Sequence, residues 1–143
     1  MKVEITTRGV AKAVADIAGL GVRARDPQPI GPEVAAVVNR STERRFESRG
    51  PGWPPLADET EQRKTGSEPL VDSGRLKSAM THQAAKQTDQ DELTVSSQQE
   101  PPYARFHQYG TKRMPKREIV ELRPSEQRQV AKLVERYVAK GKP

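Results

Sequence analysis

A Pro- and Gly-rich stretch near the middle of the chain limits the possible folds more than any other feature. Residues 49–56 read Arg-Gly-Pro-Gly-Trp-Pro-Pro-Leu, and this dense spacing of Pro and Gly excludes both an α-helix and a central β-strand. The stretch 49–69 is therefore predicted to be a long loop, and loops of this length are usually functional or disordered. Trp53 is the only tryptophan of the chain. Because disordered linkers seldom carry such a large apolar side chain, we expect Trp53 and Leu56 to anchor the loop against the folded body.

Composition excludes several classes of protein. The 143 residues suit a single domain, and only 33% of them are hydrophobic, which leaves a thin core. The chain has no cysteine, which rules out disulfides, thiolate metal sites and cysteine catalysis. No apolar run approaches the roughly 18 residues of a membrane span, and the first residues lack the apolar core of a signal peptide. These features favour a soluble, cytosol-compatible protein without a membrane partner.

The net charge of +6 is unevenly distributed along the chain. Residues 1–50 have a balance of +3 and residues 51–100 a balance of −4. Residues 101–143 hold eleven basic and four acidic side chains, a balance of +7. If the fold keeps these parts separate, the molecule has two faces of opposite potential and could associate with copies of itself. Ordinary solvation of a charged surface explains the pattern equally well.

Hydrophobic periodicity predicts an α+β fold, with two N-terminal helices and a C-terminal helix packed on a small, mostly antiparallel sheet. The first helix is expected over 8–18. The second is expected to begin with Gly31 as N-cap and Pro32 at the first helical position, and to end before Gly50. Ser125 is expected to cap the last helix, whose apolar face comprises Val130, Leu133, Val134, Tyr137 and Val138.

The predicted strands are short. Residues 2–6 alternate as a strand, and residues 93–96 are expected to pair with 81–85 in a hairpin whose tip lies at 89–91. A last strand is expected at 119–122. A short helix around residues 74–76 would follow a cap at Asp72 or Ser73. Residues 1–143 then form one domain, composed of a helical N-terminal part (1–48), the long loop (49–69), a short helix and sheet (70–123) and the C-terminal helix (124–143).

The titratable residues form no catalytic or metal-binding constellation. His107 has no nucleophile or orienting carboxylate near it in sequence, so we interpret it as a packed or hydrogen-bonded side chain. His82 likewise lacks a partner. The acidic clusters at 58–61 and 89–92 do not have the glycine-punctuated layout of a calcium loop. We therefore predict no enzymatic activity and no cofactor or metal.

Two basic features admit two interpretations each. Aromatic and basic residues interleave between Tyr103 and Arg113, which is typical of a single-stranded nucleic-acid platform. Alternatively Tyr103, Phe106 and Tyr109 pack inward from one face of a helical turn, and we favour this interpretation. On the last helix a basic side chain recurs at every fourth residue, which suits either phosphate or partner binding or a plain solvated face; these residues are Arg128, Lys132, Arg136 and Lys140.

The features without a local explanation occur in a recognisable order. A Trp-x-x-Leu loop with a following Thr and Lys precedes a Leu-x-x-Ser-Gly-x-Leu turn and then a Tyr-Ala-x-x-His-Gln-x-Gly segment. In this order the chain resembles the phage virion morphogenesis or tail-completion family of Mu-like phages and prophages. After Gly110 it departs from the family pattern, since Glu118 and Ile119 replace the usual proline and aromatic residue. The matching residues are Trp53, Leu56, Thr60, Lys64, Leu70, Ser73, Gly74, Leu76, Tyr103, His107, Gln108 and Gly110.

The resemblance implies a structural protein of the virion. It implies a tail-completion or neck component at the head–tail junction, which is present in the host cytoplasm during assembly, caps the tail tube and lets it join the head. By analogy the subunits close into a homo-oligomeric ring, a hexamer, that contacts the tail tube and the head-connector or neck proteins. A basic lining along the last helix would tolerate DNA in the channel through non-specific phosphate contacts.

The matched residues also have simple physical roles. Gly74 can adopt a positive φ before the short helix, and Gly110 permits a turn that a bulky residue would strain. The alternative to a virion component is a small basic nucleic-acid-binding protein, which would use the Tyr103–Arg113 segment and the basic C-terminal helix.

Overall fold

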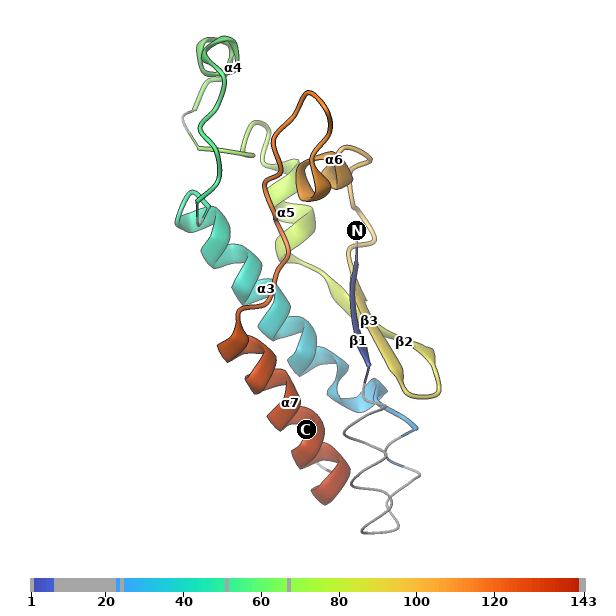
Figure 1. Ribbon diagram of the computed structural model, residues 1–143. Coiled ribbons are helices and arrows are strands. Elements are labelled where there is room, and N and C mark those ends of the chain that lie inside the picture. The colour runs from blue at the N-terminus through green and yellow to red at the C-terminus, as the bar shows by residue number, and fades with distance from the viewer. Residues whose placement is uncertain (1, 7–22, 24, 51, 67, 142–143) are drawn as a thin grey trace.

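The structure, a computed structural model, describes residues 2–6, 23, 25–50, 52–66 and 68–141 (Figure 1). The predicted helix over 8–18 lies outside these residues. Two long helices, α3 (Gly31–Glu47) and α7 (Pro124–Lys140), accompany a three-stranded sheet, which confirms the α+β class. The remaining elements are the strands β1 (Lys2–Thr6), β2 (Ala84–Asp89) and β3 (Glu92–Ser96), the 3₁₀ helix η1 (Gln28–Ile30), and the short helices α4 (Asp58–Arg63), α5 (Arg75–Thr81) and α6 (Ala104–Tyr109).

The sheet is antiparallel with the strand order β1-β3-β2. The predicted strand over 2–6 is confirmed, and it pairs with β3 so that Lys2 lies opposite Ser96. The predicted hairpin is also confirmed, with its turn between Asp89 and Glu92. The partner strand begins at Ala84, later than predicted, because α5 continues to Thr81.

Helix α3 lies between the sheet and α7 (Figure 1). Its first turn packs closely on β2, since a Cβ added at Gly31 would lie 3.1 Å from the Cβ of Ala85. The predicted start was one residue late: Ile30 is the N-cap and Gly31 the first helical residue. The helix ends before Gly50, as predicted, and its buried face consists of Gly31, Val34, Ala35, Val37, Val38, Ser41, Thr42, Arg45 and Phe46.

Helix α7 runs antiparallel to α3 and closes the core. Its predicted apolar face is confirmed, because Val130, Val134, Tyr137 and Val138 are buried and Leu133 is half-buried. The predicted cap was wrong: Arg123 is the N-cap, and Pro124 occupies the first helical position, where its missing N–H has no consequence. At the other end Arg23 donates to the carbonyls of Val138 and Ala139, and the Tyr137 hydroxyl donates to the Asp26 carbonyl.

A polar cluster joins α7 to α3 through the buried side chain of Glu126. Its Oε2 accepts from the Ser41 hydroxyl at 2.8 Å and from the Arg123 backbone N–H at 2.7 Å, and its Oε1 pairs with Arg44. Burial by itself would raise the pKa of Glu126, but the hydrogen bonds from Arg123, Ser41 and Arg44 outweigh burial and lower the pKa below its usual value. The carboxylate therefore helps to stabilise the helix pair at neutral pH.

Every helix in the described part of the chain is too short or too polar to span a membrane.

The lowered pKa of Glu126 gives a pH-dependent prediction. A carboxyl whose folded pKa lies below its unfolded value stabilises the protein above the unfolded pKa and loses that effect as pH falls through the folded pKa. Replacing Glu126 by Gln is therefore expected to lower the free energy of unfolding by about 1–3 kcal/mol at pH 7, the usual worth of hydrogen bonds to a charged group.

Chemical denaturation at neutral and acidic pH measures this difference. The gap between the wild type and Glu126→Gln should shrink below about pH 4, the range in which a carboxylate binds protons. Glu135→Gln is the matched control, because Glu135 is exposed on the same helix. An unchanged gap at acidic pH would contradict the assignment.

Candidate functional site

The segment 117–121 is buried at Arg117, Ile119 and Val120 but is not the strand predicted at 119–122. Ile119 has no exposed surface and Val120 is 6% exposed, yet neither belongs to a helix or strand. A backbone buried in this way needs partners for its polar groups, because an unpaired buried N–H or C=O costs free energy. The strand prediction was wrong because a strand and a segment held by side chains have the same pattern of apolar residues at 119–122.

Gln108 on α6 supplies three of these partners. Its Oε1 accepts from the backbone N–H groups of Ile119, at 2.7 Å, and Val120, at 3.1 Å, and its Nε2 donates to the Val120 carbonyl at 2.8 Å. One side-chain amide thus takes the place of a neighbouring strand. The main chain adds a further bond, from the Arg117 N–H to the His107 carbonyl at 2.8 Å.

Helix α3 and the long loop supply the other partners. The Glu118 carbonyl accepts from Arg45 Nη1 and from Trp53 Nε1, both at 3.1 Å. The Ser41 hydroxyl, whose one proton is donated to Glu126 at 2.8 Å, lies 3.2 Å from the Glu121 carbonyl, and Arg45 also pairs with the Glu121 carboxylate. Arg45 is 4% exposed and escaped the sequence analysis, although its helical spacing from Val38 and Ser41 places it on the buried face of α3.

Trp53 anchors the loop 49–69 as expected, whereas Leu56 is half-buried and lines the pocket described below; the loop also contains helix α4. The ring of Trp53 packs edge-on against Phe46, with 5.9 Å between ring centroids. The buried guanidinium of Arg117 donates to the carbonyls of Pro54, at 3.1 Å, and Pro55, at 2.8 Å. Because Pro has no N–H, this part of the loop cannot be fixed by backbone N–H donation from Pro54 or Pro55. The carbonyls of these residues are instead held by the side chain of Arg117.

Residues of α4, α5 and α6 and of the segments beside them line a pocket of about 820 Å³. These three helices lie toward the same end of the molecule (Figure 1). Nine of the twelve residues singled out from the sequence line it, and Trp53, Gln108 and Gly110 support its walls from outside. Nothing local in the sequence places these residues together. The nine are Leu56, Thr60, Lys64, Leu70, Ser73, Gly74, Leu76, Tyr103 and His107.

Part of the pocket's lining is apolar. Leu56, Leu70 and Met114 are half-buried and offer apolar surface to a ligand, whereas Leu76 is buried. Leu70 has a φ of +62°, a conformation that bulky residues rarely adopt. Such strain persists only where the surrounding structure enforces it.

Two glycines fix the turns that flank the pocket, as predicted. Gly74 has a φ of +80° and is the N-cap of α5, in place of the expected Asp72 or Ser73. Gly110 has a φ of +72° at the end of α6, and a Cβ there would lie 3.0 Å from the Lys116 backbone nitrogen. Both backbones need the freedom that Gly provides.

Positive charge dominates the lining of the pocket. Five basic residues face a single carboxylate, that of Asp72; the basic residues are Arg63, Lys64, Arg75, Arg113 and Arg117. Arg117 and Lys64 are engaged with backbone carbonyls, at Pro54, Pro55 and Glu68. Arg63, Arg75 and Arg113 are exposed and form no side-chain ion pair or hydrogen bond within the described part of the chain.

His107 is a half-buried wall residue of the pocket. It packs edge-on against Tyr103, with 6.3 Å between ring centroids, and its buried Nδ1 has no hydrogen-bond partner in the described structure. Burial, and to a lesser extent the charge of Arg117, lower the pKa of His107, which favours the neutral ring. The arrangement agrees with a packed histidine.

The aromatic residues of α6 do not pack inward, so the interpretation favoured from the sequence is wrong. Tyr103 is 41% exposed, Phe106 39% and Tyr109 68%. The core next to α6 is already filled by Ala104, Ile119 and Val120. The guanidinium of Arg105 lies over the Phe106 ring, 4.9 Å from its centroid.

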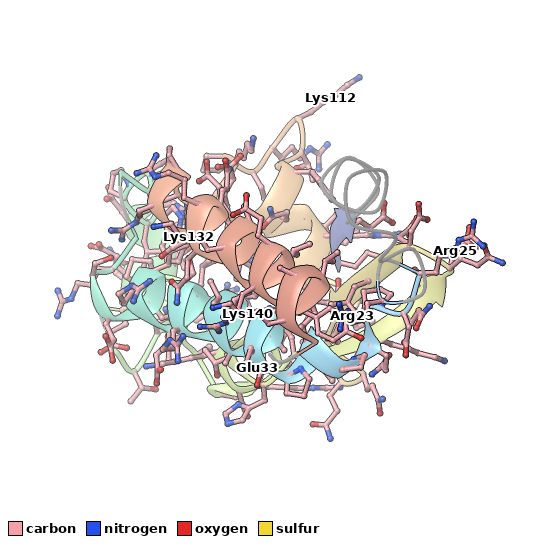
Figure 2. The ribbon with its side chains drawn as sticks, turned by 90° about the horizontal axis from the view of Figure 1, so that it is seen from below. Arg23, Arg25, Glu33, Lys112, Lys132 and Lys140 are labelled. Atoms are coloured by element: carbon pink, nitrogen blue, oxygen red, sulfur yellow. The ribbon has the colours of Figure 1, made fainter. Side chains whose placement is uncertain are left out.

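The basic residues of α7 lie on its exposed face, away from α3. All four members of the stripe are exposed, and none forms an ion pair with another described residue; they are Arg128, Lys132, Arg136 and Lys140. Figure 2 views this helix from below and shows Lys132 and Lys140 along it. The stripe is separate from the pocket.

Over the described residues no group of three or more His, Asp or Glu side chains is placed to hold a metal ion.

The contacts of Gln108 lead to a test of how the pocket is built. Replacing Gln108 by Ala leaves the buried N–H groups of Ile119 and Val120 without partners, which is expected to lower the free energy of unfolding by about 2–4 kcal/mol. Denaturant titration measures the loss. Gln127→Ala is the control, because it removes one exposed hydrogen bond, to the Leu122 carbonyl, and should cost less than about 1 kcal/mol. Equal losses for the two variants would contradict this role of Gln108.

Comparison with known proteins agrees with the family resemblance that the motifs around the pocket indicate. A search of curated proteins and a search of solved structures both return no significant match. A model of the phage virion morphogenesis family matches residues 5–139, nearly the whole chain. The match includes every residue of the pocket and of the segment 117–121. The chain belongs to the phage virion morphogenesis family.

Proposed function

We propose that this protein is a structural component of the head–tail junction, a tail-completion or neck protein that caps the tail tube and mediates its joining to the head. Membership of the family associates the chain with virion assembly. The proposal of a junction role rests on one observation at the end of the molecule formed by α4, α5 and α6. Exposed aromatic side chains there adjoin the pocket, which is lined by residues that carry the family resemblance.

The protein acts in this proposal by binding. Gln108, Trp53, Arg45 and Arg117 use their polar atoms to hold backbone groups. The polar atoms of these four side chains are therefore used to fix the backbone that shapes the surface of the protein. A pocket with a partly apolar lining and exposed aromatic residues beside it has the composition of a protein-binding surface.

The subunits are proposed to form a homo-oligomeric ring, a hexamer by analogy with related proteins, that contacts the tail tube and the head-connector or neck proteins. Head-to-tail contacts between different faces of the same chain generate closed rings when the rotation between subunits closes. The ring would sit at the junction in the virion and be present in the host cytoplasm during assembly. DNA would pass through its channel.

The unpaired basic stripe of α7 supports a role for DNA and also a second candidate function. Four exposed cations in a row can attract phosphates without reading sequence. In the first proposal they line the channel and are dispensable for joining. In the second the protein is primarily a small basic nucleic-acid-binding protein that uses this helix and the Tyr103–Arg113 segment.

A nonsense mutation in a phage that encodes this chain tests the proposal. Filled heads and complete tails are expected to accumulate unjoined, as counted by electron microscopy of lysates. The wild-type gene supplied from a plasmid should restore joined particles. A gene carrying Arg128→Ala, Lys132→Ala and Arg136→Ala together should restore them to a similar level. Joined particles in the nonsense mutant would contradict a junction role.

The same triple variant separates the two candidate functions. If the protein is mainly a nucleic-acid binder, the variant should lose salt-sensitive DNA affinity and should fail to restore particles. Thermal unfolding of the purified variant serves as the control for folding, since exposed substitutions of this kind usually change stability by less than about 0.5 kcal/mol.

A further inference from the structure

The pocket and the exposed face of α6 form one continuous surface, which we call the α6 surface. Tyr103 joins the two parts, because it lines the pocket and is also 41% exposed. Phe106 and Tyr109 follow at intervals of three residues, so the three rings occupy one side of the helix. Within the described residues, these are the large hydrophobic side chains that remain exposed.

Such a concentration of apolar surface needs an explanation in a chain that is only 4% aromatic. The three rings belong to the short helix α6 and its N-cap, Tyr103, which also lines the pocket. Scattered exposed apolar residues are normal, whereas a contiguous patch marks an interaction site. Tyr and Arg are also the residue types that most often dominate binding energy at interfaces.

The charge around the pocket specifies the chemistry of the partner. The exposed cations Arg63, Arg75 and Arg113 have no side-chain partner within the described structure, and Asp72 is the one carboxylate of the lining. A partner that offers carboxylates would pair with these cations, while a basic partner would be repelled. Planar guanidinium groups also match the two oxygens of a carboxylate.

We infer that the α6 surface binds a segment of another virion protein in which Asp or Glu side chains flank at least one large apolar side chain. The apolar side chain enters the pocket among Leu56, Leu70 and Met114, and the carboxylates pair with Arg75 and Arg113. The inference rests on the proposed assembly function for the identity of the partner as a virion protein.

A second copy of this chain fits the surface less well. Its acidic stretches, such as Asp58–Arg63 in α4 and the turn after Asp89, could supply carboxylates. The exposed large hydrophobic side chains of the described residues, however, are all at α6 or its N-cap. Neither of these two acidic stretches therefore has an exposed large apolar side chain of its own.

The test uses three short fluorescein-labelled synthetic peptides and fluorescence anisotropy. The first alternates Leu and Phe with Asp and Glu, the second replaces the acids by Asn and Gln, and the third replaces the apolar residues by Ser. At about 0.15 M ionic strength, where isolated surface charges are largely screened, the full-length protein should bind the first peptide at least about tenfold more tightly than either of the others, a difference of about 1.4 kcal/mol.

Substitutions locate the binding. Arg75→Glu combined with Arg113→Glu should weaken binding of the first peptide about tenfold or more, and Tyr103→Ala should also weaken it. The matched control is Arg128→Glu combined with Arg136→Glu on α7, which changes the charge equally and should leave the affinity within about twofold, since surface substitutions distant from a site have small effects. Arg75→Gln with Arg113→Gln replaces the charge-reversed pair if circular dichroism shows that pair to be unfolded.

Several results would overturn the inference. These are no binding of the first peptide, equal binding of the first and third peptides, and equal weakening by the α6-surface and α7 pairs. Tighter binding of an oligothymidine than of the first peptide would assign the surface to nucleic acid. Loss of the protein's own oligomers in the Arg75 and Arg113 variants, measured by sedimentation, would assign it to a second copy. The nonsense-mutant phenotype is independent of all these measurements, so the proposed function can stand if the inference fails, and peptide binding can stand if the proposed function fails.

Discussion

The structure depends on how the buried backbone of the segment 117–121 satisfies its polar groups. This segment crosses the protein without a strand beside it, yet it contributes Ile119 and Val120 to the core. Gln108, Arg45 and Trp53 each donate to its carbonyls or accept from its N–H groups. Because an unpaired buried backbone group costs about 1–3 kcal/mol, the three side chains and the segment must be in place together.

This constraint links parts of the chain that are far apart in sequence. Gln108 fixes α6 to the segment, Trp53 fixes the Pro-rich loop to it, and Arg45 fixes α3 to it. Arg117 then holds the loop through the carbonyls of Pro54 and Pro55. The pocket is the space enclosed by these attachments, so its shape follows from the same hydrogen bonds that stabilise the core. A surface built in this way is pre-formed for a partner, which reduces the entropy lost on binding.

Much of the fold followed from periodicity and turn chemistry. The strand over 2–6, the hairpin, α3 and α7 are local features, and their patterns of apolar residues predicted them to within a few residues. The strand at 119–122 was wrong because its apolar residues are the same for a strand and for a segment held by side chains. The inward packing of Tyr103, Phe106 and Tyr109 was wrong because small residues and the segment 117–121 already fill that part of the core.

The candidate site was only partly accessible from sequence. The order of motifs singled out nine residues that line the pocket, but it could not show that they meet, since they come from four separate stretches of the chain. The positive charge of the pocket lining was also not evident from the sequence. Residues 51–100 carry a net negative charge, yet they place Arg63, Lys64 and Arg75 at the pocket and turn most of their acids elsewhere. Regional charge balance does not indicate the charge of a site that selects side chains from several regions.

Hydrogen exchange of single backbone amides, followed by nuclear magnetic resonance, tests whether side chains hold the segment 117–121 in the core. The amides of Ile119 and Val120 are expected to be protected to a similar degree as the amides of β3, although neither residue lies in a helix or strand. Exchange as fast as that of Lys112, in the exposed turn after α6, would contradict the claim that side chains hold this segment in the core.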